Sequence, residues 1–473
     1  MKLYNTLTRQ IDQITPLQPP LVTVYTCGPT VYDYAHIGHW FNYVRMDTLI
    51  RVLQATGHKT KWVMNITDVG HLVSDADDGE DKLEKGARRE GKTAWQVAEF
   101  FTEDFMSGMK SLNLLTPDFI TKATDHIPEQ IALVQTLTEK GYTYQIDDGI
   151  YYDTSKFEGY ASFAALDLTE QQASGRVAVN SQKRNASDFA VWKFSPAGSQ
   201  RDMEWDSSFG QGRKGFPGWH IECSAMSMKY LGDTLDIHTG GIDHIPVHHT
   251  NEIAQSEAAT GKRFANHWMH GNHVTVNGEK VSKSLGNGVR LQEIMERGYT
   301  ADAIRLNILE SHYRSQSKFS WESLEASKNR LQHWLAVAAL VWQPQNQTLA
   351  DDAVASEVSW AAEDIASSLA NDLNTPEVLS RIDKLLPVIE NNLLSEQLIA
   401  PCKAFFEYVS RVLGIDLLAA GPLPKEVSVL LEKRSQARLD KDWSASDTIR
   451  ADIEALGYGL NDLPSGTTVW HRL

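Results

Sequence analysis

The apolar positions near the start of the chain follow two different spacings. Residues 21–25 form a short apolar run rich in β-branched side chains, which is typical of a buried strand. Gly28 and Pro29 follow and predict a turn. Between about residues 38 and 55 the apolar side chains recur at helical spacing, and the pattern stops before Gly57. The pattern therefore predicts a strand, a loop and a helix, in that order.

The alternation of strand and helix returns further along the chain. Residues 61–66 predict a second strand, which ends in the polar pair Thr67 and Asp68. Residues 219–230 predict a helix, residues 235–238 a buried strand, and the segment from His248 another helix. Strands separated by helices indicate a parallel sheet. The chain is therefore expected to belong to the α/β class.

The segments between these elements carry weaker patterns. Helical spacing extends from about residue 95 to residue 141 with a break at Pro117, and short strand-like pieces follow in residues 142–206. We therefore expect a domain inserted at about residues 115–205. Residues 273–282 alternate around Asn277 and Gly278, a pair typical of a hairpin turn.

From residue 301 onward the apolar spacing is helical, which predicts a helix bundle. Thr375 is the expected N-cap of one of its helices, with Pro376 in the first turn. Residues 421–424 predict a linker, and residues 425–473 predict one long helix followed by a small, partly extended module. The expected domains are a sheet domain at residues 1–300, a helical bundle at 301–420 and a C-terminal module at 425–473.

The composition narrows the class of protein. With 473 residues, 42% hydrophobic and 22% charged, the chain fits a globular protein of several domains. We expect neither a membrane span nor a signal peptide. The three cysteines exclude a disulfide framework and indicate a reducing, cytoplasmic location. The net charge of −16 argues against a broad nucleic-acid-binding surface, so a polyanion would bind to a local basic patch.

Two loops hold clusters of charge. Residues 75–81 contain five carboxylates, but their spacing lacks the ligand pattern of a calcium loop, so a solvated loop is favoured over a cation site. The loop after the predicted hairpin carries Lys280 and Lys283 between small hydroxyl side chains and a glycine. Such a mobile cationic loop suits a polyphosphate.

His36 and His39 flank Gly38 in the loop after the first strand. Imidazole N–H groups stabilise charge on phosphate oxygens, and a glycine allows a flat base to approach the backbone. A helix N-terminus also favours anions. The arrangement predicts a nucleotide site, although two histidines in an ordinary loop explain this motif equally well on its own.

Four residues that are distant in sequence carry ligand types that zinc prefers. His248 and Glu252 are four positions apart and share one helix face. Cys223 lies near the start of another predicted helix, and Cys27 follows the first strand. Thiolate, imidazole and carboxylate together are typical of zinc sites. A buried Cys223 and a surface Glu252 without any ion explain the spacing equally well. His249 is an alternative ligand, although it would point about 100° away from His248.

Taken together, these segments resemble a known family. The loop from Cys27 to His39 resembles the first signature of the class I aminoacyl-tRNA synthetases in their cysteinyl form, and residues 280–287 resemble the second signature. Residues 218–226 and 248–255 complete the match, which continues through residues 374–377 and 441–450. The resemblance covers the whole chain. It implies a Rossmann-type catalytic domain with an inserted connective domain, an α-helical bundle that contacts tRNA, and a C-terminal module that binds the anticodon.

The resemblance also implies a reaction. ATP would activate cysteine to cysteinyl-adenylate, and the cysteinyl group would pass to the 3′ end of a cysteine tRNA. In this family one zinc ion binds the substrate thiol, and its ligands fall here on Cys27, Cys223, His248 and Glu252. Zinc prefers sulfur to a hydroxyl, which separates cysteine from serine better than pocket size does. Magnesium is implied together with ATP.

Within the expected active site the resemblance assigns further roles. Charge stabilisation falls on His36, His39, Lys280 and Lys283, and the ATP contacts fall on His36, Gly38, His39 and Lys283. The contacts to cysteine fall on Thr67, Trp219 and Asp243. The implied partners are cysteine, ATP and cysteine tRNA, with no membrane. A dimer seam and an intramolecular bundle explain the long helices equally well, and we take a monomer as the expectation.

The chain departs from the family pattern at Val281, at residues 241–247 and at Thr250. Two other functions are compatible with parts of the resemblance. One is a cysteine ligase of the mycothiol pathway, which joins cysteine to an amino sugar; the C-terminal module argues against it. The other is an inactive tRNA-binding relative, against which the intact histidine, lysine and metal-ligand positions argue.

Overall fold

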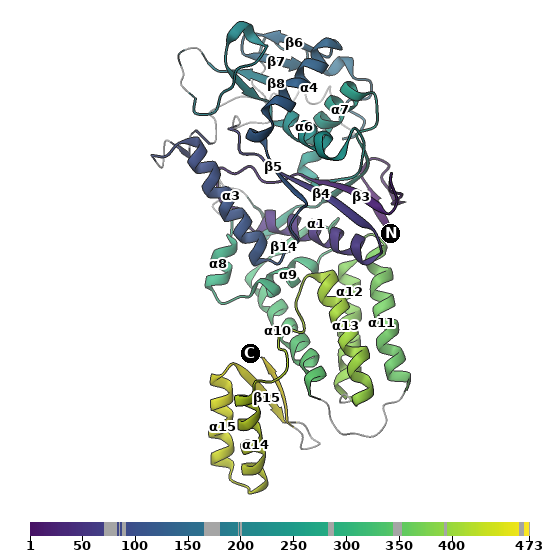
Figure 1. Cartoon of the computed structure of the whole chain (residues 1–473), viewed down its shortest axis with the longest axis vertical. Helices are drawn as coiled ribbons and strands as arrows, with labels where there is room; N and C mark the ends of the chain where they lie inside the picture. Colours follow the sequence, from purple (N-terminus) through teal and green to yellow (C-terminus); the bar gives the residue numbers. More distant parts are fainter. Residues whose placement is uncertain are drawn as a thin grey trace. The chain divides into compact units, whose positions relative to one another are not determined.

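The computed structural model describes residues 1–70, 83–84, 86–87, 91–164, 180–196, 198, 201–281, 288–343, 352–391, 395–462 and 468–472. The chain forms two compact units (Figure 1). The first consists of Met1–Thr275, Glu279–Glu293 and Tyr313–Ser317, and the second of Val276–Gly278, Ile294–His312 and Lys318–Leu473. The predicted acidic loop at residues 75–81 lies outside the described residues.

A parallel sheet organises the first unit, and it confirms the predicted α/β fold. Its five strands lie in the order β11-β10-β3-β4-β5. They are β3 (Leu21–Thr26), β4 (Lys59–Ile66), β5 (Phe119–Lys122), β10 (Leu235–Gly241) and β11 (Ala265–Gly271). From β3 the chain adds β4 and β5 on one side, and later β10 and β11 on the other. The order therefore reverses between β3 and β10, and open α/β sheets bind ligands beyond the strand ends at such a point.

The predicted helix after β3 is α1 (Ile37–Ala55), which is buried along most of its length. Trp40 of α1 stacks on Phe105 of α3 (Ala94–Ser111), with ring centroids 5.3 Å apart. A Cβ at Gly108 of α3 would lie 2.4 Å from the Trp40 ring, so a glycine permits this close packing. On the other half of the sheet, α6 (Trp219–Leu231) precedes β10 and α7 (Thr250–Thr260) follows it.

The helical spacing predicted for residues 95–141 is interrupted by a strand. α3 and α4 (Ile127–Glu139) occupy its two ends, but β5 lies between them, so the prediction is wrong for residues 119–122. β5 has four residues, which are too few to show a period of their own. Its place at the sheet edge is fixed by pairing with β4 and by the Asp118 carboxylate, which accepts a hydrogen bond from the Trp62 N–H at 2.7 Å.

An antiparallel sheet with the order β6-β7-β8-β9 also belongs to the first unit. Its strands are β6 (Thr143–Ile146), β7 (Gly149–Tyr152), β8 (Phe189–Phe194) and β9 (Gly215–Pro217). Trp192 of β8 and Val134 of α4 share one apolar core with Ile221 of α6 and Ala254 of α7. β5, within the range predicted as inserted, pairs in the parallel sheet, whereas β9 beyond that range pairs with β8. The boundaries of the inserted domain stay a prediction.

Smaller elements complete the sheets. The predicted hairpin is confirmed: β12 (Val274–Val276) and β13 (Glu279–Lys280) flank Asn277 and Gly278, whose φ angles of 52° and 87° suit a type I′ turn. Further short elements are β1 (Lys2–Asn5), β2 (Gln10–Gln13), β14 (Ser317–Phe319) and α8 (Leu291–Glu296).

The second unit is helical, as predicted from residue 301 onward. Its bundle comprises α9 (Ala301–Leu309), α10 (Trp321–Ala338), α11 (Asp352–Ala370), α12 (Thr375–Asn391) and α13 (Glu396–Leu413). The N-cap prediction is shifted by one residue, because α12 begins at Thr375 and the Asn374 side chain accepts a hydrogen bond from the Glu377 N–H at 3.4 Å. No helix within the described ranges is long and apolar enough to span a membrane.

The C-terminal segment differs from the predicted single long helix. It folds as α14 (Lys425–Leu439), α15 (Trp443–Ala455) and a hairpin of β15 (Tyr458–Asp462) and β16 (Thr468–Arg472). Lys441 has a φ of 59°, which ends the first helix, and the Asp442 carboxylate caps the second by accepting from the Ala445 N–H at 3.0 Å. Buried Arg434 of α14 donates two hydrogen bonds to Asp462 of β15, at 2.9 and 2.7 Å, and ties the helices to the hairpin.

Candidate active site

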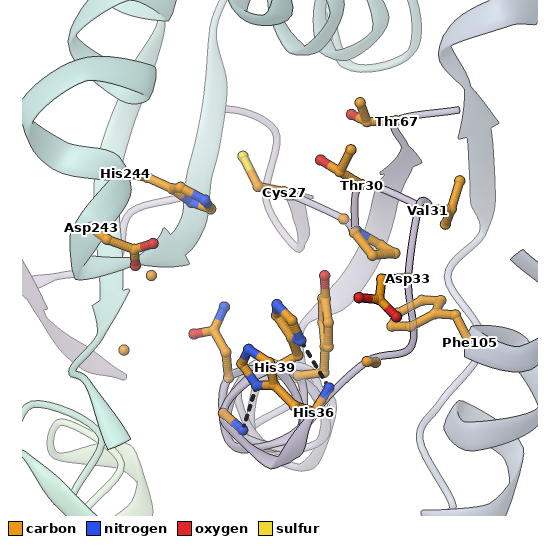
Figure 2. A pocket seen from close by; sticks show the side chains of 18 of the residues that line it. Cys27, Thr30, Val31, Asp33, His36, His39, Thr67, Phe105, Asp243 and His244 are labelled. Atoms are coloured by element: carbon orange, nitrogen blue, oxygen red, sulfur yellow. Dashed lines mark hydrogen bonds between the residues drawn. The ribbon is translucent and has the colours of Figure 1, made fainter. Parts of the chain in front are cut away.

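A cavity of about 400 Å³ lies beyond the carboxyl ends of β3 and β10. It is lined by the loop after β3, the first turn of α1, the start of α6 and the segment after β10. Figure 2 shows Cys27, Thr67, His36 and Asp243 on different sides of this space. The cavity therefore occupies the place where the strand order of the sheet reverses.

The loop after β3 is held against the end of β4. The Gly28 N–H donates to the Asn65 side chain at 2.8 Å, and a Cβ at residue 28 would lie 1.5 Å from the Asn65 carbonyl oxygen. The Val31 N–H donates to the Thr67 carbonyl at 3.1 Å, and the Thr67 N–H donates to the Pro29 carbonyl at 3.0 Å. Only glycine permits so close an approach at residue 28. The loop is thereby fixed above the sheet edge.

His36 and His39 cap the start of α1. The His36 Nδ1 accepts from the Gly38 N–H at 3.1 Å, and the His39 Nδ1 accepts from the His36 N–H at 3.1 Å. The two rings stack with centroids 3.8 Å apart. Because each Nδ1 is an acceptor, each neutral imidazole carries its proton on Nε2. These N–H groups and the helix N-terminus make this side of the cavity suited to phosphate oxygens.

Cys27, Cys223, His248 and Glu252 come together beside the cavity. All four side chains are buried, and their ligand atoms lie within 4.8 Å of one another. His248 Nε2 is 3.0 Å from Glu252 Oε1, and Cys27 Sγ is 3.8 Å from the same oxygen. Two thiols, an imidazole and a carboxylate at this spacing fit the donor set of a tetrahedral zinc ion. The structure thus brings together the four predicted ligands, and their role as ligands stays a prediction.

A second group overlaps with the first. Cys27, His238, His249 and Glu252 are also buried with their ligand atoms within 4.8 Å of one another. Cys27 Sγ lies 3.3 Å from His249 Nε2, and His249 Nε2 lies 3.9 Å from Glu252 Oε1. His248 and His249 belong to a wide π-helical turn, η5 (Ile245–His249), which brings both imidazoles to Glu252. His249 therefore remains open as an alternative ligand.

Hydrogen bonds behind these residues orient their rings. His220 Nδ1 and His248 Nδ1 are 2.9 Å apart, which leaves the His248 Nε2 directed to Glu252. His238 Nε2 lies 2.7 Å from the other Glu252 oxygen, and His249 Nδ1 lies 2.7 Å from His270 Nε2. Partners of this kind fix the tautomer and the direction of metal ligands.

The buried charges stabilise one another. Burial opposes ionisation of Glu252, but the imidazoles of His238 and His248 outweigh it and hold the pKa of the carboxyl well below its usual range. Burial likewise opposes protonation of His248, but Glu252 and Cys223 raise its pKa to about 10. Burial, followed by the neighbouring Cys223 sulfur, raises the pKa of the Cys27 thiol. A metal ion bound here would therefore replace the protons that His248 and Cys27 hold.

The other predicted site residues divide into two groups. Those that line the cavity are His36, Gly38, His39, Thr67, Trp219 and Asp243. Lys283 lies outside the described residues, and the structure describes Lys280 only by its backbone in β13.

Sequence reasoning did not single out Asn65, His220 or His238 as site residues. His220 stands inside the segment 218–226 that carried the resemblance, and His238 ends the predicted strand 235–238. Both histidines lie in predicted elements. Their hydrogen-bond partners, His248 and Glu252, belong to a later segment of the chain, and the sequence does not show this pairing.

Comparisons with known proteins identify the class of the catalytic domain. The family model described as "tRNA synthetases class I (C) catalytic domain" matches residues 13–329. The methionyl-tRNA synthetase of Mycobacterium tuberculosis, solved in complex with methionyl-adenylate, has a TM-score of 0.59 at 15% identity, over 86% of this chain and 95% of that chain. At this identity the similarity concerns the fold, which is that of the class I tRNA synthetases.

Closer relatives match nearly the full chain. The "Cysteine--tRNA ligase 1" of Burkholderia lata is 46% identical over 474 residues, 98% of this chain and 96% of that protein. The "Cysteine--tRNA ligase" of Treponema denticola is 39% identical over 501 residues and covers 100% of both chains. The chain belongs to the cysteine–tRNA ligase family of the class I tRNA synthetases.

The first prediction concerns Gly28. A Gly28→Ala substitution forces the new Cβ against the Asn65 carbonyl, so the loop or the end of β4 must move. We expect the free energy of unfolding of the first unit to fall by about 2 kcal/mol or more. Urea denaturation followed by tryptophan fluorescence measures the change. Gly86→Ala, where the nearest atom to the added Cβ lies 3.7 Å away, is the matched control; equal stability of the two variants would show that Gly28 does not fix the loop.

Proposed function

We propose that this protein is a cysteine–tRNA ligase: it activates cysteine with ATP to cysteinyl-adenylate and transfers the cysteinyl group to the 3′ end of a cysteine tRNA. The relatives in Burkholderia lata and Treponema denticola carry that name. The observation that carries the proposal is the buried group of two thiols, an imidazole and a carboxylate beside a cavity that is also lined by the capped histidines of α1. The group of thiols, imidazole and carboxylate suits a thiol substrate, and the capped histidines suit a nucleotide. One cavity would therefore hold both substrates of the activation step.

In this proposal Cys27, Cys223, His248 and Glu252 hold one zinc ion per chain. Their buried, closely spaced donor atoms support this assignment. When bound, zinc would supply a soft Lewis acid that takes a thiolate in preference to a hydroxyl. Pocket size alone gives only about 1–3 kcal/mol between substrates that differ by one small group. The donor set would therefore supply the discrimination between cysteine and serine.

The residues of the chain act mainly by positioning. Thr67, Trp219 and Asp243 would surround the bound cysteine, and the Nε2–H groups of His36 and His39 would bind phosphate oxygens of ATP, which is accompanied by Mg²⁺. The cysteine carboxylate attacks the α-phosphorus and pyrophosphate leaves; a ribose hydroxyl of the tRNA then attacks the carbonyl and AMP leaves. Charge that develops on the phosphates is stabilised by the two imidazoles, with Lys280 and Lys283 of the following loop.

The helical bundle at residues 301–420 and the module at residues 425–473 would contact the tRNA, the module at its anticodon. Exposed Lys433 of α14, Lys441 in the turn after α14 and Trp443 at the start of α15 support this part of the proposal, because ammonium groups bind RNA phosphates and an aromatic ring can stack on an unpaired base. The protein would act as a monomer in the cytoplasm, where tRNA is charged.

The second prediction tests the activation step. With zinc and magnesium present, the pure protein is expected to exchange pyrophosphate into ATP when cysteine is added, and about 100-fold more slowly with serine. The adenylate is then expected to charge a cysteine tRNA and not an amino sugar. If neither amino acid supports exchange, the protein is not an active ligase, and the inactive tRNA-binding function is supported instead. If the cysteinyl group is transferred to an amino sugar, the mycothiol-type ligase is supported.

The third prediction tests the zinc ligands. Cys223→Ser replaces a thiolate by a poor zinc ligand, so the affinity for zinc should fall by at least about 100-fold while the circular dichroism spectrum is kept. Metal analysis after dialysis measures the loss. Cys402→Ala, in α13 of the second unit, is the control and should retain the metal. Equal zinc content in both variants would mean that the ligand set is different.

The fourth prediction tests the C-terminal module. Reversing the charge of two exposed lysines, Lys433→Glu with Lys441→Glu, should raise the KM for tRNA by about 10-fold or more and leave pyrophosphate exchange unchanged. Lys156→Glu, an exposed lysine of the first unit, is the control. If tRNA charging is unaffected by the double substitution, the module does not bind RNA through this face.

A further inference from the structure

His244 lines the cavity, but neither the predicted metal group nor the proposed substrate contacts include it. It ends the short helical turn η4 (Ile242–His244), directly after Asp243. Its ring centroid lies 5.3 Å from that of His248 and 5.1 Å from that of His249. Figure 2 shows the ring beside Asp243 and directed toward Cys27. His244 therefore stands next to the metal group on the cavity side.

One ring nitrogen of His244 is buried without a partner. Among the described residues its Nδ1 has no hydrogen bond, and it packs against β10, where a Cβ at Gly240 would lie 2.7 Å from it. An unpaired buried N–H costs more than an unpaired lone pair, so Nδ1 carries the lone pair and Nε2 carries the proton.

We propose that the Nε2–H group of His244 donates a hydrogen bond to the sulfur of the bound cysteine, which makes His244 a specificity-determining residue. This inference rests on the proposed function and deepens it. The ring points toward Cys27 of the metal group, beside which the substrate sulfur would lie, whereas the substrate carboxylate would face the histidines of α1.

The chemistry of the substrate makes the contact selective. A metal-bound thiolate carries negative charge and accepts a hydrogen bond strongly, and the contact is worth more where water is excluded. A serine hydroxyl in the same place is neutral and has a smaller atom, so it gains less from the same donor. His244 would therefore add to the preference for cysteine without being a metal ligand.

The test compares two substitutions in the full-length, zinc-loaded protein. His244→Leu removes the donor and keeps the bulk, whereas His244→Gln keeps an N–H donor at a similar reach. Calorimetry should show that His244→Leu raises the Kd for cysteine about 10-fold, that His244→Gln restores most of the affinity, and that the Kd for serine changes little. Zinc content should equal that of the wild type, and His58→Leu, outside the cavity lining, should behave as wild type.

A spectroscopic measurement separates this role from a merely structural one. In the cobalt-substituted protein, loss of the N–H···S bond should shift the thiolate-to-cobalt absorption band that cysteine induces, and His244→Gln should restore it. An unchanged Kd and band in His244→Leu overturn the proposal, and so does zinc loss from both variants, because His244 would then support the metal group itself. If the wild type binds no cysteine, the proposed function fails as well; if the wild type binds cysteine and His244→Leu binds it with the same Kd, only this inference is overturned.

Discussion

The reversal of strand order between β3 and β10 is the constraint from which the site follows. In a parallel sheet all carboxyl ends meet at one edge, so residues after β3, β4 and β10 become neighbours although they are far apart in sequence. Cys27, Thr67 and Asp243 reach the cavity in this way. Glycines at residues 28 and 240 allow the close approach that a side chain would prevent. The sheet therefore supplies the geometry, and the loops and helices that follow its strands supply the chemical groups.

Within that geometry the histidines serve two purposes. His36 and His39 use their Nδ1 atoms to satisfy backbone N–H groups at the start of α1, which turns both Nε2–H groups into donors. His238 and His248 instead pair with Glu252, an ionised group that would be costly to bury alone. The cavity is thus bordered on one side by the histidines of α1, which favour phosphate. On another side lies the buried group around Glu252, which could exchange protons for a metal ion.

The sequence predicted the parts of the fold that have long, regular patterns. β3, β4, β10 and α1 could be predicted from apolar spacing, and the type I′ hairpin could be predicted from Asn277 and Gly278, whereas β11 was not predicted. β5 could not, because its four residues have no period and its position depends on pairing with β4. The break between α14 and α15 was missed because Lys441 adopts a positive φ without the usual glycine.

In the candidate site, too, some features could be predicted from the sequence and others depend on packing. Cys27, Cys223, His248 and Glu252 could be named together because the resemblance supplied their grouping, whereas spacing alone left a structural explanation open. The partners of these residues, His220 and His238, could not be inferred, since a hydrogen bond between distant segments is a property of packing. The tautomers of His36 and His39 likewise depend on the cap geometry of α1.

The distance along the chain between Cys27 and Glu252, 225 positions, has a consequence for biosynthesis. At a translation rate of about 5–20 residues per second, a ribosome delivers the second residue roughly 10–45 s after the first. During that interval the nascent polypeptide contains the Cys27 thiol but not the Glu252 carboxylate, which lies beside it in the folded structure. If the proposed zinc site is correct, the complete set of ligands would therefore form only late in the synthesis of each molecule.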